Sequence, residues 1–272
     1  MAQAEVRLGI AGAAGRMGRT LITLAEGNPA LTVSAAIEHS QSPFLGQDAG
    51  LLAGGAKTDV LIVDSLQQVI GDVDVLIDFT LPESTVQNLA VCAEASTAMV
   101  VGTTGLGDDT RHIDVAAKKV PVVFAPNMSV GVNLCFRLLE TAARVLGDDF
   151  DVEIVEAHHR HKVDAPSGTA LRMGEIVADA LGRDLKRCAV FGREGRTGPR
   201  DRETIGFETI RAGEIVGDHT VLFAGAGERI EISHHAADRS TFASGALRAA
   251  QWVSSRAPGR YDMADVLGFN DV

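Results

Sequence analysis

The alternation of apolar strand segments with helical segments in the first half of the chain most constrains its fold. Strands are expected at residues 6–11, 32–37, 73–79, 99–102 and 121–125, with helices at 16–26, 83–95 and 109–119. Strand and helix in regular succession predict parallel strands joined by right-handed crossovers. We therefore expect an α/β fold with a Rossmann-like, doubly wound parallel sheet.

The pattern changes after Asn127. Helices are expected at 130–146 and 168–181, and strands joined by glycine-containing turns at 150–158, 204–211, 219–223 and 228–234. Such a mixed or antiparallel sheet indicates a second domain of α+β type. A last helix at 240–254, with Ser240 or Thr241 as its N-cap, does not show by its periodicity on which domain it packs. The charged segment 193–202 is interpreted as a solvated, mobile loop.

Composition excludes several functional classes. Hydrophobic residues make up 46% of the chain but aromatic residues only 4%, so aliphatic side chains must build the core, as in buried parallel sheets. The net charge of −11 argues against nucleic acid or an anionic membrane as a partner, because both need a positive protein surface. No apolar run reaches the length of a membrane span, about 18 residues. Three isolated cysteines and no visible signal peptide lead us to expect a cytoplasmic protein without disulfides.

A glycine-rich loop, GAAGRMG, follows the first strand and opens the first helix. Gly12 would permit the tight turn, Gly15 the approach of a pyrophosphate to the backbone, and Gly18 close packing of the helix on the sheet. The N–H groups at the helix N-terminus would bind the phosphates. The triplet alone is a weak signal, since a simple tight turn also uses glycine, but its place between strand and helix favours a dinucleotide site.

The residues after the second strand bear on the choice of cofactor. Glu38 stands about 20 positions after the glycines, where an acidic side chain recognises a ribose hydroxyl. His39 follows, where an arginine would favour the 2′-phosphate of NADPH, and Arg16 is either a second cation for that phosphate or a solvated residue of the first turn. We expect NADH and NADPH both to serve, with NADH at least as good.

Two further segments lie where predicted strands end. They are VGTTG, which contains Gly102, Thr103 and Thr104, and APN at residues 125–127. Loops at the carboxyl ends of parallel strands form the ligand crevice of open α/β sheets. Small side chains there would let backbone groups reach the nicotinamide, although each segment alone could be an ordinary turn.

The densest chemical signal is the segment EIVEAHHRHKVDAPSGTA. It places three histidines, an arginine and a lysine within residues 158–162, ahead of a Pro-Ser-Gly-Thr helix start. Cationic side chains beside a helix N-terminus suit a dicarboxylate. One carboxylate would bind the N–H groups of Gly168 and Thr169, while Lys162 and the histidines face the rest of the molecule.

Two other interpretations of this segment compete. His158, His159 and His161 could form a metal site, although no HxxxH spacing and no cysteine partner supports one. The other interpretation is a solvated basic loop. It is disfavoured because a cluster of cations is less expected by chance in a chain with a net charge of −11. We expect no metal.

These motifs resemble those of the 4-hydroxy-tetrahydrodipicolinate reductases, long called dihydrodipicolinate reductases. Besides the segments above, the chain carries DFT at 78–80, APNMSVGVN at 125–133, FGREG at 191–195, TIGF at 204–207 and RAGEIVGDHTVLF at 211–223. The resemblance covers essentially the whole chain. EAHHRHKVDAPSGTA is its most specific part, and the glycine loop is its least specific.

The resemblance implies an NAD(P)H-dependent reduction of 4-hydroxy-tetrahydrodipicolinate, with loss of water, in diaminopimelate and lysine biosynthesis. It implies a dinucleotide-binding domain of residues 1–129 plus 240–272, a substrate domain of residues 130–239, and a homotetramer formed through the substrate domain. His158 would be the proton donor and Lys162 the second catalytic residue, with His159, Gly168 and Thr169 binding substrate. The implied cofactor-binding residues are Gly12, Ala13, Ala14, Gly15, Arg16, Met17, Glu38, Gly102, Thr103, Thr104, Ala125, Pro126, Asn127 and Met128.

Two departures and two alternatives remain open. His39 and Leu81 stand where some family members carry arginine, which puts the cofactor preference and a polar contact near the cofactor in doubt.

One alternative function is that of another Rossmann-fold dehydrogenase of aspartate-family metabolism. An aspartate-semialdehyde dehydrogenase would need a catalytic cysteine, whereas Cys92 and Cys135 lie in predicted helices. The other is a non-catalytic NAD(H)-binding regulator, which would bind cofactor but no dicarboxylate.

Overall fold

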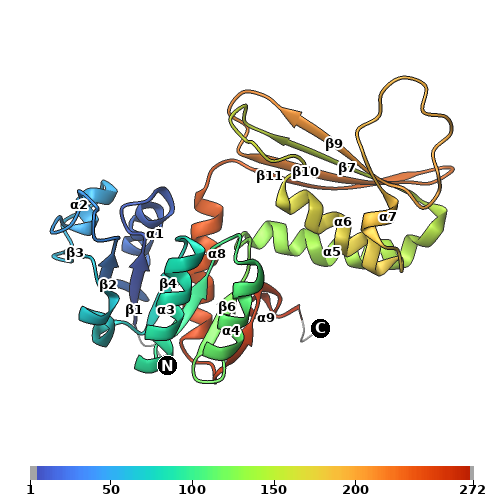
Figure 1. The fold of residues 1–272 in the computed structure, drawn as a ribbon. Coiled ribbons are helices and arrows are strands. Elements are labelled where there is room, and N and C mark those ends of the chain that lie inside the picture. The colour runs from blue at the N-terminus through green and yellow to red at the C-terminus, as the bar shows by residue number, and fades with distance from the viewer. Residues whose placement is uncertain (1–4, 270–272) are drawn as a thin grey trace. The chain divides into compact units, whose positions relative to one another are not determined.

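A computed structural model describes residues 5–269 of the chain (Figure 1). Contacts between Cα atoms divide it into two compact units. Unit 1 runs up to Val130 and resumes at Arg239, and unit 2 comprises Gly131–Asp238. The chain therefore leaves unit 1, builds unit 2 and returns.

Unit 1 contains a seven-stranded sheet whose paired strands run parallel. The strands are β1 (Val6–Ala11), β2 (Leu31–Ile37), β3 (Ile62–Val63), β4 (Val75–Asp78), β5 (Ala98–Val101), β6 (Pro121–Phe124) and β12 (Gly259–Tyr261). Their order is β12-β6-β5-β4-β1-β2-β3, so the winding reverses between β1 and β4. Open α/β sheets bind ligands at such a switch point, outside the carboxyl ends of the strands.

Helices cover both faces of this sheet (Figure 1). Along β4, Val75 and Ile77 join the core under α1 (Arg16–Glu26) and α8 (Ser240–Val253), while Leu76 joins the core under α3 (Pro82–Ala95) and α4 (Thr110–Ala116). Both faces of the strands are buried, which is why their sequences are nearly continuous apolar runs. The other elements of unit 1 are α2 (Ala49–Ala53), α9 (Met263–Leu267) and 3-10 turns at Leu66–Gln68, Ile70–Asp72 and Gly107–Asp109.

Unit 2 contains a mixed five-stranded sheet of order β11-β10-β7-β9-β8. Its central strand β7 (Asp151–His158) pairs antiparallel with β10 (Gly217–Ala224) and parallel with β9 (Ile205–Arg211). The helices α5 (Val130–Leu146) and α6 (Gly168–Ala180) pack on one face of the sheet. The remaining elements are α7 (Leu185–Cys188), β8 (Ala189–Phe191), β11 (Arg229–Ala236) and a 3-10 turn at Gly147–Asp149.

The structure confirms the predicted fold class and corrects details. Helices α1 and α5 have the predicted bounds. The elements α2, β3, α7, β8, β12 and α9 were not predicted, because two to five residues are too few to show a period. The predicted N-cap of the last helix was wrong: Arg239 holds that position, and Ser240 is the first helical residue.

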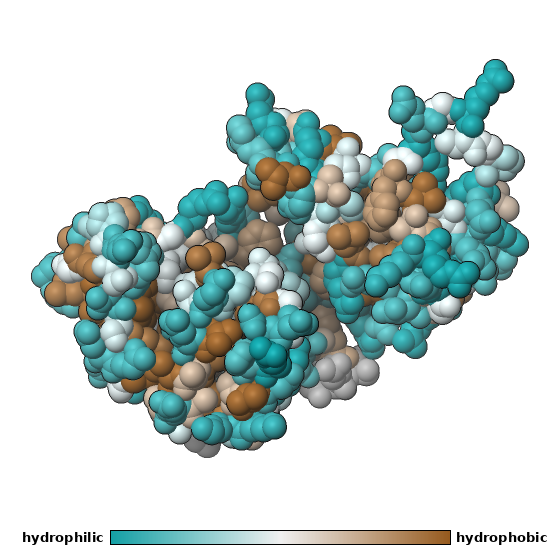
Figure 2. All heavy atoms as spheres, in the orientation of Figure 1, coloured by the Kyte–Doolittle hydropathy of each residue, from teal (hydrophilic) through white to brown (hydrophobic). Residues whose placement is uncertain are grey.

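The surface in view is largely hydrophilic, with apolar side chains interspersed (Figure 2). Among residues 5–269, no helix is long and apolar enough to cross a membrane. Leu81 and Val163 are exposed apolar side chains, at 68% and 98%, and both lie in segments expected to face ligands.

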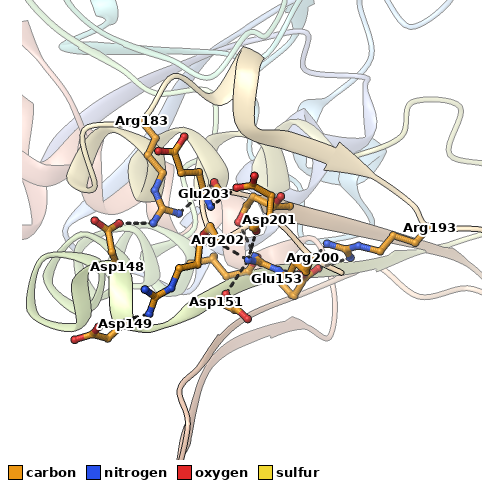
Figure 3. A network of polar contacts seen from close by, with 12 residues as sticks. Asp148, Asp149, Asp151, Glu153, Arg183, Arg193, Arg200, Asp201, Arg202 and Glu203 are labelled. Carbon is orange, nitrogen blue, oxygen red and sulfur yellow. Dashed lines mark hydrogen bonds and ion pairs between the residues drawn. The ribbon is translucent and has the colours of Figure 1, made fainter. Parts of the chain in front are cut away.

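The segment 193–202, interpreted above as a solvated loop, is exposed over most of its length but tied down near both ends (Figure 3). Arg193 donates two hydrogen bonds to the Glu153 carboxylate, each of 2.9 Å. Arg200 donates to Glu153 (2.9 Å) and Asp151 (2.8 Å) on β7, and to the Thr204 carbonyl (2.6 Å). Arg193 and Arg200 therefore attach the segment to the first residues of β7.

Arg200→Ala should lower the free energy of unfolding by about 2–3 kcal/mol, because several hydrogen bonds to charged or carbonyl acceptors are lost together. Arg202 is the matched control, since its ion pair with Asp149 is 3.8 Å long and both side chains are at least 75% exposed. Arg202→Ala should leave stability nearly unchanged. Urea unfolding measures both variants, and equal effects would show that the partners of Arg200 do not matter.

Candidate active site

The glycine loop lies at the carboxyl end of β1. Gly12 has a φ of 70°, a left-handed conformation that favours glycine, and its N–H donates to the Ile37 carbonyl at 2.8 Å. A β-carbon on Gly18 would collide with the backbone of Gly12 and Ala13, so the third glycine lets α1 begin close against the loop. Gly15 is the exposed N-cap of α1. An anion can therefore approach the first turn of this helix.

Glu38 lies over the glycine loop. Its Oε1 accepts a hydrogen bond from the Ala14 N–H at 3.0 Å, and its Oε2 accepts one from the His39 N–H at 3.2 Å. A carboxylate has about four lone-pair sites, so acceptor capacity remains for ribose hydroxyls. His39 and Arg16 are exposed, while Met17 is half-buried.

Asp78, the last residue of β4, is a fully buried carboxylate that orders the neighbouring loops. It accepts hydrogen bonds from the Thr80 N–H (2.8 Å) and from Asn88 Nδ2 (2.9 Å). Thr103 Oγ1 donates to it at 3.3 Å and accepts from the Thr85 hydroxyl at 2.8 Å. The Thr103 side chain thus points into the protein, and its backbone is what this position offers a cofactor. The DFT motif had been noted in the sequence, but no role was predicted for its aspartate.

The other predicted cofactor residues also lie on loops after strands. Gly102 lies against the Phe79 ring, which a β-carbon would strike, and Thr104 is exposed. After β6, Ala125 and Met128 are buried, Asn127 accepts from the Ser129 N–H at 2.9 Å, and Pro126 is exposed. The sheet order places the loops after β1 and β4 on either side of the switch point. Unit 1 therefore has the arrangement that a dinucleotide requires.

In unit 2 the buried face of β7 changes from apolar to polar along the strand. Val152 and Ile154 belong to the core, but the next residues on that face are Glu156 and His158, which are 1% and 9% exposed. Alternate residues of a strand lie on the same face, so these two side chains are neighbours. His158 Nδ1 lies 2.6 Å from Glu156 Oε2.

Adjacent strands complete this polar end of the sheet. On β9, Thr209 stands opposite Glu156 and Arg211 opposite His158. Arg211 binds the Glu156 carboxylate through both terminal nitrogens, each at 2.8 Å. On β10, His219 stands opposite Glu156, and its ring contacts that of His158 edge to face, with centroids 5.1 Å apart.

Glu156, Arg211 and His219 were not among the predicted site residues. One signal was available: an acid two residues before a histidine on a predicted strand must share a face with it. Arg211 and His219 lie in the segment RAGEIVGDHTVLF, which was noted only for the family resemblance, and no local pattern shows that they reach Glu156 and His158, since their positions depend on strand register.

The environment shifts the pKa values of this cluster in opposite directions. Burial lowers the pKa of His158 below its ordinary value, and Glu156 only partly offsets this. Burial by itself raises the pKa of Glu156, but the hydrogen bonds from Arg211 and His158 outweigh it, and the net shift is downward. Glu156 is therefore a carboxylate at neutral pH, and His158 in the ligand-free protein is mostly neutral.

The start of α6 lies beside this pair. The Ser167 N–H donates to Glu156 Oε1 at 3.1 Å, and the Ser167 hydroxyl caps the helix by accepting from the Ala170 N–H at 3.2 Å. Gly168 and Thr169 are the first two residues of the helix, as the predicted anion site requires.

The predicted cations lie on the segment between β7 and α6. Lys162 Nζ is 2.8 Å from Asp164 Oδ1, and its side chain is 21% exposed. His159 is half-buried, with its ring 6.2 Å from that of His161. Within unit 2, Glu156 links His158 to the N-terminus of α6, and Lys162 is close enough to His158 to disfavour its protonated form. His159 is the next residue after His158.

His219 should make stability fall in mild acid. Burial, together with the neighbouring His158 and His234, lowers the pKa of His219 to about 4, and Glu156 and Asp218 only partly offset this. The unfolded chain therefore takes up a proton near pH 6.5 that the folded protein accepts only near pH 4, so stability is present above about pH 6.5 and is lost as pH falls toward about 4. The loss should be on the order of 2–3 kcal/mol by urea unfolding. His219→Gln should lose less over this interval, and parallel curves for the two proteins would contradict the assignment.

This geometry bears on two of the alternative interpretations, a dehydrogenase with a catalytic cysteine and a metal site formed by histidines. A cysteine nucleophile needs a thiolate, but burial raises the pKa of Cys92 to about 12 and raises that of Cys135. In the part of the chain that the structure describes, no group of three His, Cys, Asp or Glu side chains is placed to hold a metal ion. His158 directs Nδ1 at Glu156 instead.

Fold and site together define a two-domain oxidoreductase that uses a nicotinamide dinucleotide. Family models described as the N-terminus and the C-terminus of dihydrodipicolinate reductase match residues 6–128 and 131–267. The chain belongs to the dihydrodipicolinate reductase family.

Individual relatives agree with this membership. A protein of Alkalilimnicola ehrlichii named 4-hydroxy-tetrahydrodipicolinate reductase is 62% identical over 96% of this chain and 98% of its own. One of the same name from Acinetobacter baumannii is 58% identical over 99% of this chain and 98% of its own. A solved structure, dipicolinate-bound dihydrodipicolinate reductase from Paenisporosarcina sp. TG-14, covers 96% of this chain and 98% of its own with a TM-score of 0.73. At 23% sequence identity, this likeness shows a shared fold and nothing further.

Proposed function

We propose that this protein reduces (2S,4S)-4-hydroxy-2,3,4,5-tetrahydrodipicolinate to 2,3,4,5-tetrahydrodipicolinate, with loss of water, in diaminopimelate and lysine biosynthesis. The relatives at 62% and 58% identity bear the name of this reductase. The observation within the chain that carries the proposal is the grouping of His158, Lys162 and the α6 N-terminus. His158, proposed as the proton donor, would thus lie next to two groups proposed to bind carboxylates.

His158 supplies the proton in the proposed reaction. Loss of the C4 hydroxyl and a C5 proton as water leaves a C4=C5 double bond conjugated with the ring imine, and a bound nicotinamide would supply a hydride to C4. Electron density would then move toward the ring nitrogen and be met by a proton, and transfer of a proton from nitrogen to C5 would restore the imine of the product. His158 would donate the proton to the ring nitrogen from Nε2, because Nδ1 is engaged by Glu156 at 2.6 Å. A dianionic substrate beside the ring raises the affinity of His158 for that proton.

The two carboxylates of the substrate would bind two different groups. Lys162 would hold one, taking it in place of the Asp164 side chain that it now contacts at 2.8 Å. The backbone N–H groups of Gly168 and Thr169 would hold the other, helped by the dipole of α6. His159 is proposed as a further substrate-binding residue. The relative from Paenisporosarcina contains dipicolinate, a dicarboxylate of this kind.

The cofactor is proposed to bind the carboxyl-end loops of unit 1. The first turn of α1 would hold the pyrophosphate, Glu38 the adenosine ribose, and the loops after β5 and β6 the nicotinamide. The Glu38 carboxylate accepts hydrogen bonds from free ribose hydroxyls and repels a 2′-phosphate. We therefore expect use of both cofactors, with NADH at least as good as NADPH.

His39→Arg should improve the Michaelis constant for NADPH more than that for NADH. The side chain at position 39 is 70% exposed and adjacent to Glu38, so a guanidinium there can reach a 2′-phosphate. Steady-state kinetics with both cofactors measures the ratio. A wild-type enzyme that prefers NADPH by about tenfold, or about 1.4 kcal/mol, would show that other cations dominate this site.

We also propose a homotetramer that acts in the cytoplasm. The sheet face of unit 2 opposite α5 and α6 carries half-buried and exposed apolar side chains, among them Val155, Leu222 and Ile210. Association of copies through this face would cover them. Light scattering of the purified protein tests the assembly. The cytoplasmic location rests on three cysteines that form no disulfide.

The test of the function is oxidation of NADH and NADPH in the presence of enzymatically generated 4-hydroxy-tetrahydrodipicolinate. The expected result is oxidation that requires both the protein and the substrate, and that survives dialysis against a chelator. Oxidation with aspartate semialdehyde instead would favour another dehydrogenase. Tight NADH binding without turnover or dicarboxylate binding would favour a regulator.

A further inference from the structure

We propose that Glu156 is a positioning residue that fixes the tautomer and ring orientation of His158, and that Arg211 holds Glu156 in place for this task. The proposal rests on the proposed function only in taking His158 as the proton donor. Which ring nitrogen of His158 carries the proton that Glu156 fixes can be tested without measuring turnover.

The Glu156 carboxylate is surrounded by donors. Its Oε1 accepts from the Ser167 N–H (3.1 Å), the Thr209 hydroxyl (3.3 Å) and Arg211 (2.8 Å), and its Oε2 accepts from Arg211 (2.8 Å). These donors come from α6 and from β9, and Glu156 itself is 1% exposed. A buried carboxylate bound in this way cannot rotate or take up a proton without losing several hydrogen bonds at once.

This surrounding settles the tautomer of His158. An ionised carboxylate only accepts hydrogen bonds, so the ring nitrogen 2.6 Å from Oε2 must carry a hydrogen. Nδ1 is therefore protonated in both charge states of the ring, and Nε2 is the atom that gains and loses a proton. An orienting carboxylate on the far nitrogen is how functional histidines are generally held for proton transfer.

Gly217 on β10 leaves space beside Nε2 of His158, the nitrogen that gains and loses a proton. A β-carbon at this position would lie 3.0 Å from His158 Nε2, closer than ordinary packing allows. The side chain missing at 217 thus keeps the proton-transferring atom accessible from this strand.

Four groups from three strands and a loop act on the charge of His158. Glu156 on β7 favours its protonated form, whereas Lys162 on the following loop and Arg211 on β9 disfavour it. His219 on β10 contacts the ring edge to face and is neutral above about pH 4. Glu156 is therefore the group among these four that supports a protonated ring.

Glu156→Gln distinguishes positioning from mere structure. In this variant the amide oxygen should take the Oε1 position, where three donors converge, which leaves the NH2 group facing His158 Nδ1. The ring must then accept at Nδ1 and carry its hydrogen on Nε2. Turnover should fall roughly 10–100-fold, by analogy with the loss of the carboxylates that orient metal-bound histidines. The basic limb of the pH–rate profile should move to lower pH, because the charge that favours protonated His158 is gone.

Glu153→Gln is the matched control. Glu153 also lies on β7 and is also bound by arginine, in its case by Arg193 and Arg200, but it is on the opposite face from His158. The Glu153→Gln variant should have a lower free energy of unfolding, with no change in the tautomer of His158 or in the pH–rate profile. A purely structural role for Glu156 would make the two variants alike.

The direct readout is the 15N resonances of the His158 ring in the full-length protein, assigned by their loss in His158→Gln. Protonated Nδ1 in the wild type and a changed tautomer in Glu156→Gln support the proposal. An unprotonated Nδ1 in the wild type, or a wild-type tautomer in Glu156→Gln, overturns it. If His158→Gln retains full turnover while the tautomer result holds, the proton-donor role fails and the positioning geometry stands.

Arg211→Gln keeps the proposal testable should Glu156→Gln fail to fold. Glutamine at 211 can still donate a hydrogen bond to Glu156, which Ser167 and Thr209 also bind, so the carboxylate stays in contact with His158 but is held less firmly. The variant also removes a charge that disfavours the protonated ring. The His158 titration should move to higher pH, opposite in sign to the effect of Glu156→Gln. An unchanged titration in Arg211→Gln would contradict the proposed coupling of the three residues.

Discussion

Replacement of His158 by glutamine is expected to lower turnover by about 10²–10⁴-fold, the range usual for loss of a general acid. Glutamine fills a similar space and keeps a polar group, but it cannot deliver a proton at neutral pH. NADH affinity should change little, because the proposed cofactor loops belong to unit 1 and His158 to unit 2. Pre-steady-state and steady-state kinetics with the dicarboxylate substrate measure the effect.

His161→Gln provides the control for this variant. His161 belongs to the same HHRHK run but is exposed, and its ring lies beside that of His159 rather than that of His158. It should retain turnover close to that of the wild type. Equal losses in the two variants would point to a general disturbance of the segment, and full activity of His158→Gln would disprove the assignment.

Lys162→Met should lower turnover roughly 10²–10³-fold, as expected when a group that stabilises developing charge is removed from an active site. Methionine retains much of the aliphatic stem, so packing is preserved while the ammonium is lost. The Michaelis constant for the dicarboxylate should rise, with NADH binding unaffected. A matching loss of NADH affinity would instead give Lys162 a role in the cofactor site.

Asp164→Asn is the companion variant. Lys162 lowers the pKa of Asp164, so at neutral pH the two form an ion pair, 2.8 Å long, that a substrate carboxylate must replace. Removing the charge of Asp164 should leave turnover intact and keep the Michaelis constant equal or lower. A large rise in that constant would mean that Asp164 assists binding rather than competing with the substrate.

Local patterns predicted much of this fold and part of this site. The strand, glycine loop and helix from β1 to α1 were predicted from adjacent residues, and the left-handed Gly12 confirms the tight turn. The run HHRHK begins at the last residue of β7, where the structure has the buried Glu156–His158 pair. Each of these signals lies within one short stretch of chain.

The residues that sequence reasoning missed depend on long-range register. Arg211 binds Glu156 across 55 positions of sequence, and His219 reaches Ser167 across 52. A shift of the β7–β9 pairing by one residue would put Arg211 on the opposite face, and no local pattern specifies that pairing. The loop 193–202 shows the same limit, because its attachment depends on Glu153, 47 positions before Arg200.

The most direct test of the proposed reaction is the fate of deuterium from NADH that carries deuterium at both C4 positions of the nicotinamide. With enzymatically generated 4-hydroxy-tetrahydrodipicolinate as substrate, we expect one deuterium in the tetrahydrodipicolinate product, on the ring carbon that carried the hydroxyl group. Mass spectrometry and NMR of the product would locate it. Oxidation of NADH that leaves no deuterium in this product, or no oxidation with this substrate at all, would contradict the proposed reaction.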